Sequence, residues 1–126
     1  MRKELLLVGL ILLLGCRTKL LDESTVNVDP TQRQFKEIDP ISSAQKINAS
    51  AKANNGQFNI FVYLAKDRAE VEKDMEQDKA GAKVLAHKLK VSEADLQATI
   101  PANEKAVVAL TSCDGKKAEV KLKISN

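Results

Sequence analysis

The most reactive side chains in this sequence are two cysteines and one histidine, Cys16, Cys113 and His87. A cysteine nucleophile needs a histidine beside it to raise its reactivity, and no motif around Cys113 or His87 indicates such a pair. A single histidine also makes no metal site without carboxylates in a defined arrangement. We therefore predict a surface position for His87 and a core or turn-flanking position for Cys113. The alternative role for Cys113 is a reactive or partner-bridging thiol.

Five carboxylates occupy every second position in one short stretch, which raises the question of a metal site. They are Glu70, Glu72, Asp74, Glu76 and Asp78. At a spacing of two, side chains on a helix point all around its axis and not toward one centre. We interpret the stretch as a solvated helix face. Because the five glycines are also isolated and form no phosphate-binding loop, the sequence predicts no metal, no cofactor and no enzymatic activity.

The N-terminal segment before Cys16 is typical of bacterial export signals. Residues 1–4 carry charges, residues 5–14 are apolar apart from Gly9, and the small residue Gly15 precedes the cysteine. The apolar run is too short to span a bilayer, which needs about 20 such residues. We predict a signal peptide over residues 1–15.

The four residues 13–16, Leu-Leu-Gly-Cys, resemble the lipobox of bacterial lipoproteins. The resemblance implies cleavage between Gly15 and Cys16, a diacylglycerol thioether on Cys16 and an acyl chain on the new amine. Two or three acyl chains hold a protein stably in a membrane, whereas one chain holds it only marginally. The alternative is an ordinary signal peptide in which Cys16 is incidental. Arg17 stands where an Asp would favour retention in the inner membrane, so the outer membrane is favoured.

The rest of the chain divides into a polar segment and a folded domain. A chain of 126 residues with 44% apolar residues is long enough for one domain and is not disordered throughout. Its formal net charge of +3 gives no case for nucleic acid as a partner. Residues 17–40 are polar and lack sustained periodicity, so we predict that residues 16–40 consist of the lipidated cysteine followed by an extended tether. The alternative is that part of this segment packs as an edge strand. The domain is expected over residues 41–126.

Alternation of apolar and polar residues predicts strands within that domain. Residues 57–64 form the strongest pattern and are expected to be a central strand covered on both faces. A buried strand over 106–113 and an alternating strand over 118–124 are separated by Asp114-Gly115, which predicts a closing hairpin. Weaker patterns place strands at residues 47–51, in the second half of 83–91 and at 96–100, with a turn over 92–95.

One surface helix is expected between the central strand and the later strands. Asp67 and Glu70 have the spacing of a capping box, and Gly81 is placed to end the helix. Its apolar stripe is thin and consists of Val71 and Met75. With five or six short strands and one helix, the sequence predicts a mainly β protein, a small antiparallel β-sandwich.

The order of motifs in the domain resembles the type VI secretion outer-membrane lipoproteins, the TssJ family, including their divergent IglE-like branch. The resemblance covers about residues 44–112 and follows the lipobox. Residues 47–51 lead to the turn Asn54-Asn55-Gly56. The hydrophobic strand of residues 60–64, a helical acidic stretch, residues 96–100 and the Pro101 turn then follow in the family's order.

This resemblance implies a transthyretin-like β-sandwich that is lipid-anchored in the outer membrane, faces the periplasm and binds the periplasmic part of an inner-membrane secretion protein. The nearest candidates for partner-binding loops are the turn after the first strand and the start of the helical insertion. Their residues are Asn54, Asn55, Gly56, Gln57, Lys66 and Asp67. The alternatives are a surface-displayed binding lipoprotein, such as an adhesin or host-factor ligand, and a periplasmic inhibitor or immunity lipoprotein.

Overall fold

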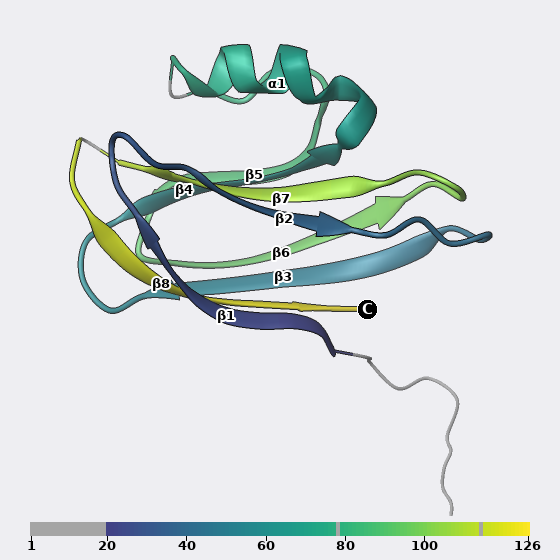
Figure 1. Ribbon diagram of the computed structural model, residues 1–126, viewed down its shortest axis with the longest axis horizontal. Coiled ribbons are helices and arrows are strands. Elements are labelled where there is room, and N and C mark those ends of the chain that lie inside the picture. Colours follow the sequence, from purple (N-terminus) through teal and green to yellow (C-terminus); the bar gives the residue numbers. More distant parts are fainter. Residues whose placement is uncertain (1–19, 78, 114) are drawn as a thin grey trace, which may run out of the picture.

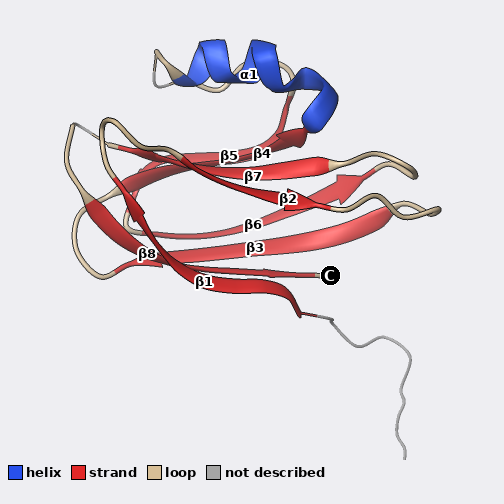
Figure 2. Cartoon of the chain, viewed as in Figure 1, coloured by secondary structure: helices blue, strands red, loops and turns tan. Residues whose placement is uncertain are grey.

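The computed structural model describes residues 20–77, 79–113 and 115–126, which form an antiparallel β-sandwich with one helix (Figures 1 and 2). One sheet has the strand order β1-β8-β3-β6 and the other β2-β7-β4-β5. The predicted mainly β sandwich with a surface helix is thus confirmed. The strands are β1 (Leu20–Val28), β2 (Gln34–Ile38), β3 (Gln45–Ala53), β4 (Phe58–Leu64), β5 (Val84–Val91), β6 (Glu93–Ile100), β7 (Ala106–Ser112) and β8 (Ala118–Ser125).

The core lies between the two sheets and is built by strands that alternate apolar and polar residues. In β8 the residues Ala118, Val120, Leu122 and Ile124 are buried, and the residues between them are exposed. β4 differs because all its residues are buried, and it lies between β7 and β5. The prediction of a central strand covered on both faces is confirmed. Such a strand reads as a continuous apolar run because neither of its faces meets water.

The tether predicted over residues 16–40 is wrong for residues 20–38, because these form β1 and β2. β1 pairs with β8 and β2 pairs with β7, each at the edge of its sheet. The alternative of an edge strand is therefore confirmed, and the sandwich begins at Leu20 rather than at residue 41. The sequence signal is weak because an edge strand needs few inward apolar residues; here Val26, Val28 and Ile38 reach the core.

The closing hairpin predicted around Asp114-Gly115 is also wrong. β7 belongs to one sheet and β8 to the other, so their connection crosses the sandwich. The turn itself exists, since Gly115 has a positive φ of 69° and Cys113 bridges to Lys116. Asp114 lies outside the described residues. Among the described strands, only β4 and β5 are consecutive in the chain and lie in the same sheet, and the helix connects them.

The helix is shorter than expected and starts differently. A 3₁₀ turn (Ala65–Asp67) leads directly into α1 (Arg68–Met75), and the Asp67 side chain makes no capping hydrogen bond. The predicted capping box and the predicted helix end at Gly81 are therefore wrong. The chain turns away after Met75, where the carbonyl of Asp74 accepts hydrogen bonds from the amides of Gln77 and Lys79. No helix within the described ranges is both long and apolar enough to cross a membrane.

Strands β5 and β6 are longer than predicted, and β5 carries an irregularity fixed by a buried amide. β5 occupies all of Val84–Val91, and the predicted turn over 92–95 shrinks to Ser92 because β6 starts at Glu93. The pairing register between β4 and β5 shifts between Phe58 and Ile60 of β4. The shift lies next to Lys90 of β5, whose φ is positive at 54°. Asn59, which is 1% exposed, accepts the Lys90 amide at 2.9 Å and donates to Thr111 Oγ1 at 3.1 Å. This buried side chain therefore ties β5 to β7 through β4.

Candidate functional site

The two sheets present very different outer faces. On β2-β7-β4-β5, the helix lays Val71 and Met75 over Phe61 and Tyr63, and all four side chains are buried. Figure 1 shows the helix above this sheet, and no helix of the described residues lies below the other one. The outer face of β1-β8-β3-β6 is therefore the broad sheet surface that the described chain leaves uncovered.

Polar side chains cross this open face in two rows set by the strand register. The first row runs Glu23, Lys123, Ser50, Asp95, and the second runs Thr25, Lys121, Lys52, Glu93. The three lysines of these rows lie on the inner strands β8 and β3, and the three acids lie on the edge strands β1 and β6. We call these eight side chains the charged face. Opposite charges on the edge and inner strands attract each other, whereas Lys52 and Lys121 lie directly opposite each other and repel.

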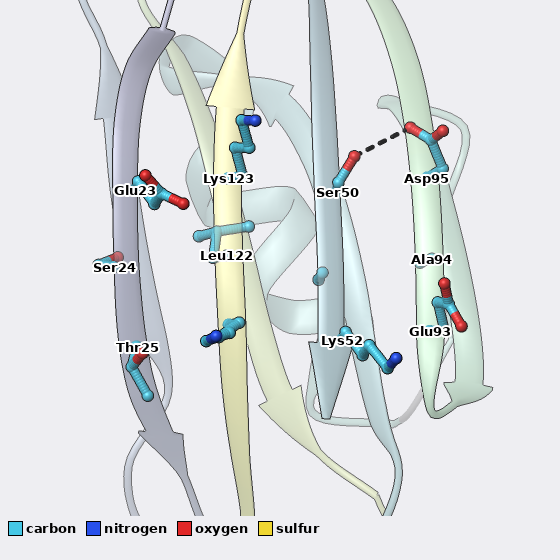
Figure 3. A pocket seen from close by; sticks show the side chains of 12 residues that line it. Glu23, Ser24, Thr25, Ser50, Lys52, Glu93, Ala94, Asp95, Leu122 and Lys123 are labelled. Carbon is cyan, nitrogen blue, oxygen red and sulfur yellow. Dashed lines mark hydrogen bonds between the residues drawn. The ribbon is translucent and has the colours of Figure 1, made fainter. Parts of the chain in front are cut away.

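The charged face is hollowed. A depression of about 600 Å³ lies over all four strands and is lined by these rows together with Ser24, Ala51, Ala94 and Leu122. Figure 3 shows the labelled carboxylates of Glu23, Glu93 and Asp95 flanking the lysines. Ser50 Oγ donates a hydrogen bond to Asp95 Oδ1 at 3.2 Å, marked by the dashed line.

This lining is suited to recognition. It offers ammonium, carboxylate and hydroxyl groups, which form ion pairs and hydrogen bonds with another macromolecule. Each exposed ion pair contributes about 0–1 kcal/mol, so useful affinity here needs a partner that engages several of them at once. A depression that crosses four strands provides the area for such multiple contacts.

Beneath the helix, Tyr63 has an unusual environment. It is fully buried, and its hydroxyl has no hydrogen-bond partner among the described residues. Burial raises the pKa of Tyr63 to about 12, and the positive charge of Arg68 opposes that rise. Arg68 is held close by, with its guanidinium 4.6 Å from the Phe35 ring centroid and its Nε 2.7 Å from Glu72 Oε2. The contact with Phe35 joins the helix to β2, and the pair with Glu72 lies within the helix and orients Arg68.

We expect Tyr63→Phe to raise the free energy of unfolding by about 1 kcal/mol, because it removes a desolvated hydroxyl without a protein partner. Tyr63 stays neutral in the folded protein up to about pH 12, whereas it ionises in the unfolded chain from about pH 10. The free energy of unfolding of the parent is therefore unaffected by this ionisation below pH 10 and falls between pH 10 and 12. Urea unfolding across this pH range checks both effects. The variant should lose less stability than the parent above pH 10. A destabilised variant would show that the hydroxyl is bonded.

The structure separates the residues considered for nucleophilic chemistry. His87 is exposed on the edge strand β5, opposite Phe61, in the predicted surface position. Cys113 is 4% exposed and follows β7 directly, in the predicted core or turn-flanking position. From strand spacing and rise, the two backbones lie roughly 16 Å apart. No group of three or more His, Cys, Asp or Glu that could hold a metal occurs among the residues the structure describes.

The candidate partner-binding loops lie at opposite ends of the sandwich. Asn54 to Gln57 precede β4, and Lys66 and Asp67 follow it, so about 20 Å of strand separates them. The first loop is held by Asn54 Nδ2, which donates to Glu119 Oε1 at 2.5 Å. The second is held by an ion pair of 3.1 Å between Lys66 and Glu104. They cannot form one site. Gly15 and Cys16, the predicted cleavage and lipidation residues, lie outside the described residues.

No protein-family model matches this chain, and no curated protein matches its sequence. The charged face itself escaped sequence reasoning, although alternation of Glu119, Lys121 and Lys123 with apolar residues marks one outward strand face. The other strands of the face come from distant parts of the chain, and only the strand order places them beside β8.

Proposed function

We propose that this protein is a lipid-anchored envelope lipoprotein that serves as a non-enzymatic assembly component of a bacterial secretion complex of the type VI kind. It is attached to the outer membrane through diacylglycerol and an N-acyl chain on Cys16. Its domain faces the periplasm and binds the periplasmic part of an inner-membrane protein through the charged face.

The observation that carries this proposal is an uncovered charged sheet face on a domain whose first strand starts just after a lipobox-like sequence. β1 begins at Leu20, four residues beyond Cys16. Four residues reach about 14 Å at most, so an acylated Cys16 keeps the sandwich at the membrane surface. The charged face then serves as the partner-binding side, because the helix occupies the corresponding face of the other sheet.

The proposal is tested by reversing the two lysines of one row in the full-length chain. The double variant Lys52→Glu, Lys121→Glu turns the centre of the charged face acidic. After mild solubilisation of the native envelope, the parent is expected to co-purify with one integral inner-membrane protein that has a periplasmic domain. The double variant should recover at least ten-fold less of it. The matched control is Lys83→Glu, Lys88→Glu, which changes the same charge at exposed positions beside and on β5.

Each outcome decides between the candidate roles. Equal loss in both double variants, or in neither, would exclude the charged face as the binding side. Digestion of the domain by protease added to intact cells would contradict the periplasmic orientation and favour a surface-displayed adhesin or host-factor ligand. Copurification with a soluble lytic enzyme in place of an inner-membrane protein would favour an inhibitor or immunity lipoprotein.

A further inference from the structure

Exposed apolar side chains gather at one end of the sandwich. Four large hydrophobic side chains are exposed within the described residues, and three of them, Leu20, Leu21 and Ile41, belong to this end, with 49%, 37% and 43% of their surface accessible. The fourth, Leu85, lies on the edge strand β5. We call the three side chains the Leu20 end. Scattered single exposed leucines need no explanation, but a group at one end of a domain does.

The residues of the Leu20 end are fixed by backbone pairing and by side-chain packing. Leu20 starts β1 and pairs with Ser125 at the finish of β8. Ile41 lies in the β2–β3 connection, where its carbonyl accepts a hydrogen bond of 2.7 Å from the Asn103 amide. Leu21 and Ile41 line one hollow of about 220 Å³. Leu21 and Ile41 are therefore held close together, and Leu20 is the preceding residue in the same strand as Leu21.

The same end is where the chain enters the sandwich from Cys16. If Cys16 is acylated, as the proposed function requires, its lipid chains lie in the bilayer and Leu20 follows within about 14 Å. The opposite end, with the loop around Asn55, lies farther along β3, which spans about 27 Å. Of the two ends, the one carrying the apolar side chains is the nearer in the chain to the lipid attachment.

Charges at this end favour an apolar contact over an electrostatic one. Asp22, Glu37 and Asp39 share the hollow with Leu21 and Ile41. Glu37 also pairs with Lys105 at 3.4 Å. An acidic rim gains nothing from anionic headgroups, so any attraction to the membrane comes from burying the aliphatic side chains at its interface.

We propose that the Leu20 end rests against the phospholipid bilayer, with Leu20, Leu21 and Ile41 in its interface. This inference depends on the proposed lipid anchor. In this orientation the strands stand upright on the membrane, and the loop around Asn55 points away from the membrane surface. The charged face is then roughly perpendicular to the membrane.

The chain contains no tryptophan, so one introduced tryptophan reports on its own surroundings. Ile41→Trp and the matched variant Asn55→Trp, also at an exposed loop position, are made in the full-length, lipidated protein. Both are reconstituted into phosphatidylcholine vesicles that contain lipid brominated near the headgroup. We expect Ile41→Trp fluorescence to fall at least two-fold relative to unbrominated vesicles and to shift to shorter wavelength. Asn55→Trp fluorescence should change by less than a tenth.

Two failures are distinguishable in this experiment. If the protein floats with the vesicles but both tryptophans are quenched alike, or neither is, the inference is overturned while the lipid anchor stands. If the protein does not float, the anchor itself is wrong, and with it the proposed function. Should Ile41→Trp fail to fold by circular dichroism, Leu21→Trp serves as the reporter under the same criteria.

Discussion

A chain that starts at Ile41 is expected not to fold. It lacks β1 and β2, which contribute Val26, Val28 and Ile38 to the core between the sheets. Burying an aliphatic side chain of this size contributes about 1.5–3 kcal/mol, so their loss removes roughly 5–9 kcal/mol. The whole stability of a domain this size is about 5–15 kcal/mol. The shortened chain should show no cooperative transition in urea when followed by circular dichroism.

The control for this truncation is a chain that starts at Lys19 and keeps both strands. It should unfold cooperatively, because it retains the pairings of β1 with β8 and of β2 with β7. A cooperative transition of similar midpoint in both chains would mean that residues 20–38 are dispensable. They would then behave as the tether that the sequence suggested.

Cys16→Ser is expected to abolish incorporation of labelled palmitate completely. Serine has no thiolate to receive the diacylglycerol, and without acyl chains nothing comparable holds the domain in a membrane. The variant should also be recovered as uncleaved precursor or as a soluble form in place of the mature lipidated protein. Metabolic labelling and fractionation of the expressing bacterium measure both effects.

The matched control is Cys113→Ser, which changes the only other thiol in the chain. Cys113 is buried beside the β7–β8 turn, where a lipid-transferring enzyme does not reach it in the folded domain. This variant should keep its label and its membrane location. Label that persists in Cys16→Ser would refute the anchor and the function proposed on it.

The sequence was most informative where both faces of a strand are buried or where alternation is sustained. β4 and β8 were placed correctly because packing on these strands demands a continuous or strictly alternating apolar pattern. β1 was missed because an edge strand with a solvated outer face shows few apolar residues. In β1 the inward positions that are buried are Val26 and Val28.

Local patterns could not supply the pairing of strands. Asp114-Gly115 between two strand patterns favours a hairpin, yet the same residues here connect two different sheets. Turn chemistry fixes how the chain reverses, whereas the sheet that the next strand joins depends on distant partners. The helix shows a similar limit, because its start follows from the extended Leu64 and the 3₁₀ turn rather than from a capping side chain.

The charged face illustrates why the candidate site was harder to predict than the fold. Lys52 and Glu93 lie 41 positions apart in the chain, yet they are direct neighbours across β3 and β6. Each of these strands alone shows an ordinary polar side. The pattern of acids outside and lysines inside exists only once the order β1-β8-β3-β6 is known.

The position of β8 has a consequence for the timing of folding. β8 lies between β1 and β3, so β1 has no neighbour in its sheet until residues 118–125 have been synthesised. Contacts of such wide sequence separation form late. The sheet β1-β8-β3-β6 therefore stays incomplete until β8 has been made. For the exported lipoprotein that we propose, this delay suits passage through a narrow translocation pore, since a precursor that collapsed early would block its own passage.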